Sequence, residues 1–249
     1  MEQANKSDVL YRTRWQALLS VDDLVADVVS AVERAAAANG RKGYVIFSSD
    51  HGYRFGQFRM PQGKWNVYEN DISIPWLIMG PGVAPGSTFS HIASQVDTMP
   101  TILGLAGVDT PSTMDGRSLA PLLLGAASAG GGASPAWRDA VLIEYESISD
   151  LHDGKGPQKH QCDSVNNTFR ALRIMNASHD MMYAEFTDVS VAKDWNFPLA
   201  GLNFFELYNV SEDAFMLHNQ YATADPALKD ALHAQLAAAY RCKGQAECP

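Results

Sequence analysis

The sequence has no long apolar run, no excess of positive charge and an odd number of cysteines. Residues 118–137 carry no charge but are rich in Gly, Ser and Pro, so no transmembrane span is expected. Charges interrupt the first residues, from Met1 to Arg12, so we expect no signal peptide within them. The net charge of −9 argues against nucleic-acid binding through a basic face, although it leaves room for a local basic pocket.

Two common catalytic motifs are also missing. No Gly-x-Ser-x-Gly elbow is present, so a Ser-His-Asp triad has no support, and no Gly-rich phosphate loop occurs. The composition, 46% apolar and 19% charged, is that of an ordinary globular protein. At 249 residues the chain is long enough for one large domain or two smaller ones.

Cysteines and sequons indicate a secretory origin. Cys242 and Cys248 lie close together in a Gly-containing segment and are predicted to close a small disulfide loop, which leaves Cys162 over. Four Asn-x-Ser/Thr sequons, more than chance alone supplies, are predicted glycosylation sites: Asn5, Asn166, Asn176 and Asn209.

Hydrophobic spacing predicts an α/β protein with a boundary in its middle. The Ala/Gly/Ser-rich stretch 125–134 is a predicted linker, which gives domains at 1–128 and 129–249. The polar stretch 152–162 is expected to be an exposed loop. The predicted helices cover 11–38, 96–105 and a segment that starts at Pro226; the predicted strands cover 44–47, 74–79, 141–145, 169–174, 181–186 and 204–208.

The strand 44–47 organises the candidate site. Its four residues are all apolar, so we expect it to be buried on both faces. It ends in Ser48-Ser49-Asp50-His51-Gly52, and in α/β folds the loops past the carboxyl ends of such strands carry the chemistry. A carboxylate beside an imidazole at that place predicts a metal or anion site.

The order of motifs around this strand resembles the sulfatase family. The resemblance rests on Ser49-Asp50-His51-Gly52-Tyr53 followed by 56–58, Lys64, Tyr68-Glu69 and 74–75. It continues through 96–103, 114–116, 166–168, 183–186 and 207–209. It implies an alkaline-phosphatase-like α/β core over 1–128 and a small α+β subdomain over 129–249. It also implies a sulfuric ester hydrolase that acts on a sulfated glycan and uses Ca²⁺ in a lysosomal or extracellular setting.

The resemblance assigns roles to three residues. Asp50 is similar to a carboxylate ligand of the family's cation, and a hard divalent ion prefers such oxygen donors. His51 stands where sulfatases carry Asn or His, so it is expected to bind the metal or the sulfate. Lys64 is similar to the lysine that contacts the sulfate. Arg54 and Gln57 are possible substrate neighbours, and Trp65 replaces an expected basic residue.

The resemblance also shows what is missing. The family makes its formylglycine nucleophile in a Cys/Ser-x-Pro/Ala-x-Arg motif, and no cysteine or serine here stands in a Cys-x-Pro-x-Arg context. The early acidic pair of the calcium site is absent too, so only the C-terminal half of a sulfatase is resembled. We therefore assign no catalytic residue and expect the chain alone to be inactive.

Two alternatives stay open. The chain is compatible with a non-catalytic protein that binds sulfated glycan or a partner. It is also compatible with a metal-dependent phosphatase or phosphodiesterase of the same architecture, in which Asp50 and His51 would bind zinc.

Overall fold

The computed structural model describes residues 2–60, 62–125, 137–147, 167–187 and 201–248. The chain forms two compact units: Met1–Trp65 with Glu69–Ser87, and Asn66–Tyr68 with Thr88–Pro249. Among the described helices, none is long and apolar enough to cross a membrane. The predicted boundary at 128/129, the loop 152–162, Cys162 and Asn166 lie outside the described residues and stay predictions.

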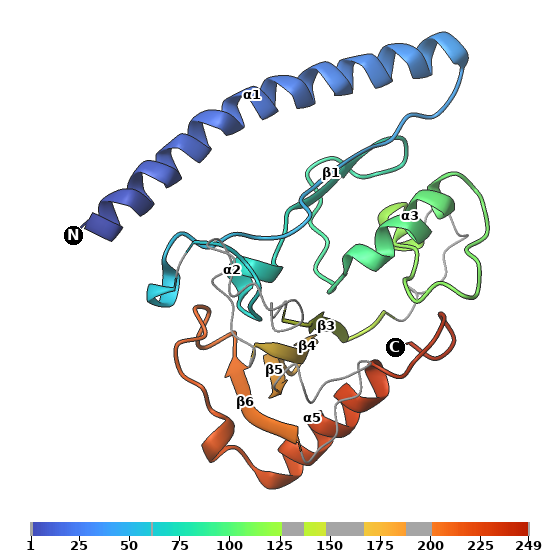
Figure 1. Cartoon of the computed structure of the whole chain (residues 1–249). Coiled ribbons are helices and arrows are strands. Elements are labelled where there is room, and N and C mark those ends of the chain that lie inside the picture. The colour runs from blue at the N-terminus through green and yellow to red at the C-terminus, as the bar shows by residue number, and fades with distance from the viewer. Residues whose placement is uncertain (1, 61, 126–136, 148–166, 188–200, 249) are drawn as a thin grey trace, which may run out of the picture. The chain divides into compact units, whose positions relative to one another are not determined.

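The first unit pairs one long helix with a two-stranded ribbon. Its elements are α1 (Glu2–Asn39), β1 (Val45–Ser48), η1 (Gln57–Arg59), α2 (Glu69–Ile72) and β2 (Trp76–Met79) (Figure 1). Helix α1 ends at the predicted stop, where Gly40 has a φ of 58°, a left-handed conformation that glycine adopts without strain. Strands β1 and β2 are antiparallel, with Val45 opposite Met79 and Ser48 opposite Trp76.

The burial predicted for the strand 44–47 is wrong in this structure. Val45 and Ile46 of β1 are half-buried, whereas Phe47 and Ser48 are exposed. The apolar run predicts the strand correctly, but burial on both faces requires neighbours that this unit does not supply. Within the described residues β1 pairs with β2 alone.

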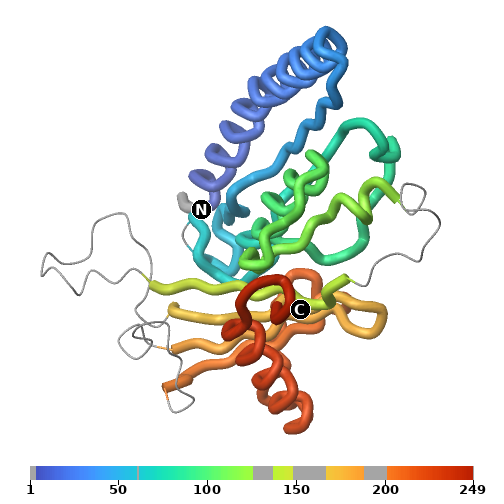
Figure 2. Tube along the Cα trace, turned by 90° about the vertical axis from the view of Figure 1, so that its right-hand side faces the viewer, coloured from blue at the N-terminus to red at the C-terminus, as the bar shows by residue number. Residues whose placement is uncertain are grey.

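The second unit is built on a four-stranded antiparallel sheet. The strands β3 (Ala140–Tyr145), β4 (Thr168–Met175), β5 (Asp180–Thr187) and β6 (Leu202–Asn209) are hydrogen-bonded in that order. Helix α5 (Pro226–Ala239) lies across one face of this sheet (Figure 2). The remaining elements are η2 (Gln95–Asp97), α3 (Thr98–Leu105), α4 (Ala120–Leu123) and η7 (Tyr221–Thr223).

The core of the second unit lies between α5 and the sheet. Leu232 and Leu236 of α5 pack with Leu172, Tyr183 and Leu207 of the strands, all of them buried. The helix starts where its capping residues predict: the Oδ1 atom of Asp225 accepts a hydrogen bond from the amide of Ala227 at 2.8 Å.

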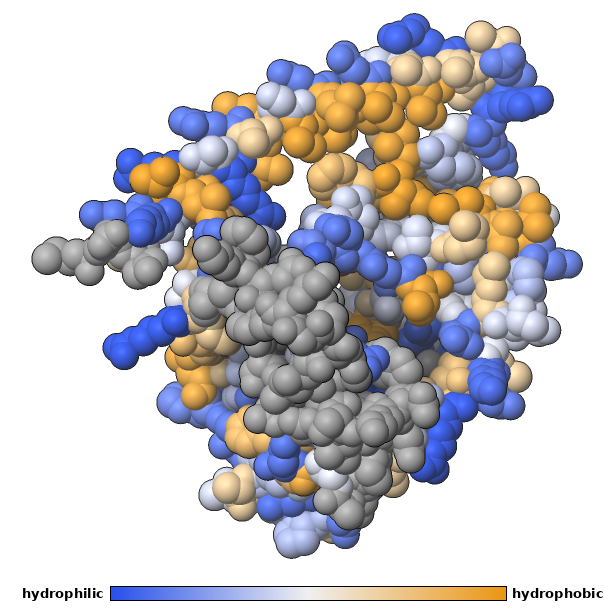
Figure 3. Space-filling view, in the orientation of Figure 1, coloured by the Kyte–Doolittle hydropathy of each residue, from blue (hydrophilic) through white to orange (hydrophobic). Residues whose placement is uncertain are grey.

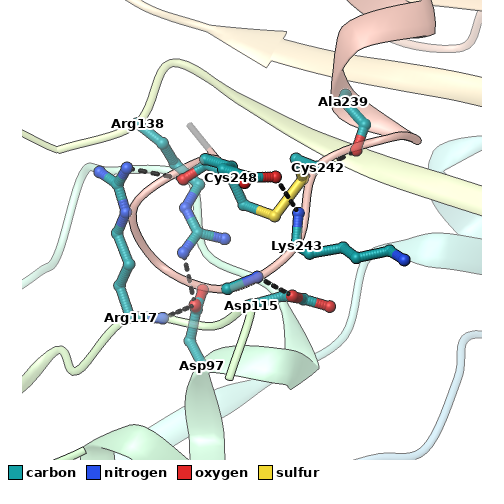
Figure 4. The surroundings of a disulfide bond; sticks show 10 residues. Asp97, Asp115, Arg117, Arg138, Ala239, Cys242, Lys243 and Cys248 are labelled. Carbon is teal, nitrogen blue, oxygen red and sulfur yellow. Dashed lines mark hydrogen bonds and ion pairs between the residues drawn. A yellow bond between two sulfur atoms is a disulfide. The ribbon is translucent and has the colours of Figure 1, made fainter. Parts of the chain in front are cut away.

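A disulfide loop closes the C-terminus of this unit. Cys242 and Cys248, the two cysteines that the sequence places together, are joined (Figure 4). The loop is tied back to the chain: Arg117 donates to the carbonyl oxygen of Cys248 at 2.8 Å, and the amide of Gly244 donates to Asp115 Oδ1 at 2.6 Å. The disulfide therefore holds a loop that clamps the segment before α4.

Reduction of this disulfide is expected to destabilise the second unit. Closing a loop of this size stabilises a fold by about 2 kcal/mol through the entropy of the unfolded chain. Chemical denaturation of the Cys242→Ser/Cys248→Ser variant should show a loss of that order. The Cys162→Ser variant serves as the matched control, and an unchanged midpoint in the double variant would contradict the expectation.

A buried carboxyl group lies within β6. Glu206 is almost fully buried, and the Tyr68 hydroxyl donates to its Oε1 atom at 3.1 Å. Burial raises the pKa of Glu206 above its ordinary value of 4.5, because the charged form loses its hydration; hydrogen bonds from Tyr68 and Tyr208 oppose this shift.

The raised pKa of Glu206 predicts a pH-dependent contribution to stability. The folded protein holds this proton more tightly than the unfolded chain, so the contribution is present below the unfolded pKa and is lost as pH rises through the folded pKa. Glu206→Gln removes the charge and should raise the Tm at neutral pH but not at acid pH. Glu212→Gln, at an exposed position, is the control, and equal effects in both variants would refute the role of burial.

Candidate metal and anion site

The loop after β1 brings a carboxylate and an imidazole together. The Nδ1 atom of His51 lies 2.6 Å from the carbonyl oxygen of Gly52, and because a carbonyl only accepts, Nδ1 carries a hydrogen. In the neutral ring the lone pair is then on Nε2, which lies 3.2 Å from Asp50 Oδ2. The imidazole nitrogen and the carboxylate oxygen therefore lie side by side in this loop.

The two side chains differ in exposure. The Asp50 side chain is 83% exposed, and that of His51 is half-buried. An open carboxylate beside a fixed ring can reach a ligand without a rearrangement of the core. Whether Asp50 and His51 bind a ligand stays a prediction.

A buried ion pair supports the loop that follows β1. Arg54 Nη1 pairs with Asp71 Oδ2, and both side chains are almost fully buried. The amide of Gly52 donates to the carbonyl oxygen of Asp71 at 2.8 Å. At Gly52 an added Cβ would lie 2.1 Å from the Asn70 carbonyl oxygen, so only glycine permits this approach. The segment around α2 therefore supports the loop that carries Asp50 and His51.

Lys64 follows a backbone bridge within the connection between β1 and α2. The amide of Arg54 donates to the Gly63 carbonyl at 2.8 Å, and the amide of Gly63 donates back at 3.2 Å. This bridge returns the chain beside the segment that follows His51, and the half-buried Lys64 is the next residue. Trp65 after it has a φ of 93°, a conformation that costs a bulky residue free energy and often marks functional loops.

The prediction for Arg54 is wrong. Its guanidinium group is not exposed to a substrate, because it is buried against Asp71. Gln57 is exposed, but its Oε1 atom accepts a hydrogen bond from the Phe55 amide, so it orders the loop. A basic residue next to a candidate anion site is weak evidence of substrate contact. A nearby acidic side chain can pair with it equally well and keep it buried.

Sequence reasoning missed two contributors to this region. Asp71 pairs with Arg54, and the spacing of the two residues in the sequence carries no local signal of an ion pair. Arg14 of α1 lies over the rings of Tyr53 and Phe55, with its guanidinium carbon 5.7 and 5.4 Å from the ring centroids. Only a contact between α1 and the loop reveals that arrangement.

The donors in this loop fit part of a divalent-cation site. Asp50 and His51 supply one oxygen and one nitrogen, whereas Ca²⁺ takes six or more oxygen ligands. Among the described residues no group of three or more His, Cys, Asp or Glu side chains converges. Further ligands for a cation would be backbone carbonyl, amide or water oxygens, or residues that the structure does not describe.

The predicted glycosylation sites differ in accessibility. Asn176 is exposed at the turn between β4 and β5, and Asn5 is exposed on α1. Asn209 is half-buried at the end of β6, where its Oδ1 atom accepts a hydrogen bond from Ser211 of the same sequon at 2.7 Å. The structure thus leaves Asn176 the most open of the sequons in the second unit that it describes.

Comparisons with known proteins identify the family. The sulfatase family model matches residues 2–108, and the model for the C-terminal part of N-sulphoglucosamine sulphohydrolase matches residues 56–182. The chain belongs to the sulfatase family. Together the two matched ranges include Asp50, His51 and Lys64.

Curated sulfatases are similar along almost the whole chain. N-acetylglucosamine-6-sulfatase from Homo sapiens is 36% identical over 250 residues, which cover 95% of this chain and 42% of the human protein. The Bos taurus enzyme is 35% identical over 95% of the chain and 41% of its own length. An extracellular sulfatase homolog from Drosophila melanogaster is 38% identical over 55% of the chain. The chain therefore spans less than half the length of these relatives.

Solved structures confirm an alkaline-phosphatase-like sulfatase fold. A protein solved in complex with its substrate D-glucosamine-2-N,6-O-disulfate matches with a TM-score of 0.65 and 24% identity, over 88% of this chain and 38% of that one. A phosphonate monoester hydrolase from Silicibacter pomeroyi matches with a TM-score of 0.59 and 26% identity, over 86% of this chain and 37% of that one.

One segment satisfies the looser letters of the formylglycine motif. The segment is Ser134-Pro135-Ala136-Trp137-Arg138, which has the form Ser-x-Ala-x-Arg. The stricter pattern Cys-x-Pro-x-Arg does not include this form. Ser134 lies outside the described residues. Arg138 is buried and donates to Asp97 Oδ1 at 2.7 Å, and the Trp137 indole donates to the Ile92 carbonyl at 2.6 Å. Trp137 and Arg138, the two described residues of this segment, thus have hydrogen-bond partners in the second unit.

The Arg54–Asp71 pair is expected to support folding, whereas Asp50 is not. Asp71→Asn leaves the Arg54 charge buried without its counter-charge, which costs about 3–5 kcal/mol. Asp50→Asn changes an exposed side chain of the same loop and should stay within about 0.5 kcal/mol of the parent protein. Equilibrium denaturation compares the two variants, and similar losses would show that the pair does not anchor the loop.

Proposed function

We propose that this chain contributes the metal- and sulfate-binding wall of a sulfatase that acts on a sulfated glycan, as N-acetylglucosamine-6-sulfatase does by name. The observation that carries the proposal is the similarity to that enzyme over 95% of the chain. Asp50, His51 and Lys64 all belong to the connection between β1 and α2. A solved neighbour was captured with a disulfated glucosamine, which supports a sulfated amino sugar as the substrate class.

Each residue has a distinct task in this proposal. Asp50 and His51 hold the cation, and Lys64 donates hydrogen bonds to the sulfate oxygens, where negative charge must be stabilised in the transition state. A bound Ca²⁺ would act as a Lewis acid on the sulfate ester. Because the chain has no Cys-x-Pro-x-Arg motif, it is expected to release no sulfate by itself.

A phosphoryl-transfer enzyme is the second candidate. The likeness to a phosphonate monoester hydrolase supports it, as does the Nε2 atom of His51, because an imidazole nitrogen suits zinc better than calcium. Lys64 and the similarity of the C-terminal unit to N-acetylglucosamine-6-sulfatase favour the sulfatase. The two candidates differ in the metal that Asp50 and His51 would bind.

A secretory location fits the same proposal. The Cys242–Cys248 disulfide forms readily in oxidising compartments, and Asn176 is an exposed sequon. A Drosophila relative is named as extracellular. We propose that the protein is lysosomal or extracellular.

The reaction can be tested by transplanting the chain into human N-acetylglucosamine-6-sulfatase in place of the region that it matches. The chimera should release sulfate from N-acetylglucosamine 6-sulfate. Lys64→Ala should lower kcat by about 10²–10³, the cost of losing one group that stabilises transition-state charge, and Asp50→Ala should lower it at least as much. Lys42→Ala, an exposed lysine of the same unit, is the control.

One outcome would refute the sulfatase proposal, and another would refute only the expected inactivity of the chain by itself. A folded chimera that hydrolyses a phosphonate monoester but no sulfate, and retains zinc after dialysis, would favour the second candidate. Sulfate release by the chain alone would remove the need for a separate nucleophile. In that case mass spectrometry of the peptide with Ser134 would decide whether this serine has become formylglycine.

A further inference from the structure

A three-residue segment shortly after Lys64 belongs to a different unit from its neighbours. Asn66–Tyr68 cluster with the second unit, whereas Met1–Trp65 and Glu69–Ser87 form the first. The chain therefore leaves the first unit just after Lys64 and returns to it where α2 starts. Because the proposed function assigns the sulfate to Lys64, the contacts that hold this segment bear on the position of that lysine.

Burial fixes the middle of this segment. Val67 is 1% exposed, so its side chain is part of a packed interior. Several apolar side chains of the first unit are far more open: Figure 3 shows them gathered along α1, and Leu77 of β2 is 58% exposed. A buried β-branched side chain has little rotamer freedom, so Val67 restricts the backbone that follows Lys64.

A hydrogen bond between residues far apart in the sequence fixes the end of the segment. The Tyr68 hydroxyl donates to Glu206 Oε1 at 3.1 Å, across a separation of 138 residues in the chain. The rings of Tyr68 and Tyr208 meet edge to face, with their centroids 6.3 Å apart. Glu206 and Tyr208 are both buried, and as alternate residues of β6 they lie on one face of the sheet. Tyr68 is thus tied to the sheet of the second unit.

Lys64 is held on its other side as well. The backbone bridge between Arg54 and Gly63 ends directly before it, and Gly63 is buried. Four residues of chain span at most about 14 Å, so few free dihedrals separate Lys64 from Tyr68. The lysine side chain is long and flexible, and the position of its backbone therefore decides which atoms its ammonium group can reach.

We propose that Tyr68 and Glu206 are positioning residues for Lys64. The hydrogen bond between them fixes the backbone after Lys64, so that the ammonium group meets the sulfate oxygens in one orientation. This inference rests on the proposed function, because it takes Lys64 to contact the sulfate. It gives the sheet of the second unit a task in the reaction, although that sheet carries none of the residues expected to touch the substrate.

A double-mutant cycle in the chimera described above tests the link to Lys64. Tyr68→Phe removes the hydroxyl donor and should lower kcat about tenfold, because one hydrogen bond contributes about that factor. In the Lys64→Ala background the same substitution should have almost no further effect, since no ammonium group is left to position. Glu206→Gln keeps an oxygen acceptor and should retain most of kcat, whereas Glu206→Leu should match Tyr68→Phe.

Tyr183→Phe is the matched control. The Tyr183 hydroxyl donates to the buried Glu185 at 2.6 Å, so this variant also removes a hydrogen bond from a tyrosine to a buried glutamate of the same sheet. It should lower the denaturation midpoint about as much as Tyr68→Phe does. It should leave kcat unchanged, both alone and in the Lys64→Ala background, because it is not tied to the segment that follows Lys64.

Hydrogen exchange of the chain by itself tests the tie without any catalysis. Tyr68→Phe should speed the exchange of the amides of residues 63–68, and Tyr183→Phe should not. Unchanged exchange there, or additive effects of Tyr68→Phe and Lys64→Ala on kcat in an active chimera, would overturn the proposal. A parent chimera that releases no sulfate would instead refute the proposed function, and the exchange experiment would still show whether Tyr68 fixes this segment.

Discussion

The ion pair between Arg54 and Asp71 is the constraint on which the candidate site depends. Both groups are buried, so each needs the other to offset its lost hydration. The pair joins the segment after His51 to α2, and the Gly52 amide bond to Asp71 adds a second tie. An exposed acid can be oriented for a ligand only if the backbone beneath it does not move, and here a buried pair provides that support.

The two units illustrate how burial depends on what surrounds an element. The sheet of the second unit has a helix across one face and a disulfide-closed segment after that helix, so its apolar residues are covered. The ribbon of the first unit has comparable apolar residues, but in the described part of the chain Phe47, Leu77 and Met79 stay exposed. The chain spans 42% of the human relative and 38% of one solved structure.

Local chemistry made several elements predictable. Asp225-Pro226 predicted the start of α5, because a capping side chain and a fixed φ act within one turn. Helix α1 begins well before the predicted residue 11. The prediction missed its first two turns because they lack the apolar stripe on which the prediction relied. The partners of Arg54 and Arg14 were not predictable, since each contact joins segments whose approach no local pattern encodes.

The sequence alone determined the motif order that indicates a sulfatase, the neighbours Asp50 and His51, and the positions of most helices and strands. These follow from backbone propensity, side-chain period and the residue types that bind anions and cations. Only the tertiary structure decided that Arg54 supports the loop instead of facing a substrate, and that β1 and α1 stay exposed. The reason is physical: burial and ion pairing are properties of two segments in contact, and neither segment specifies its partner by itself.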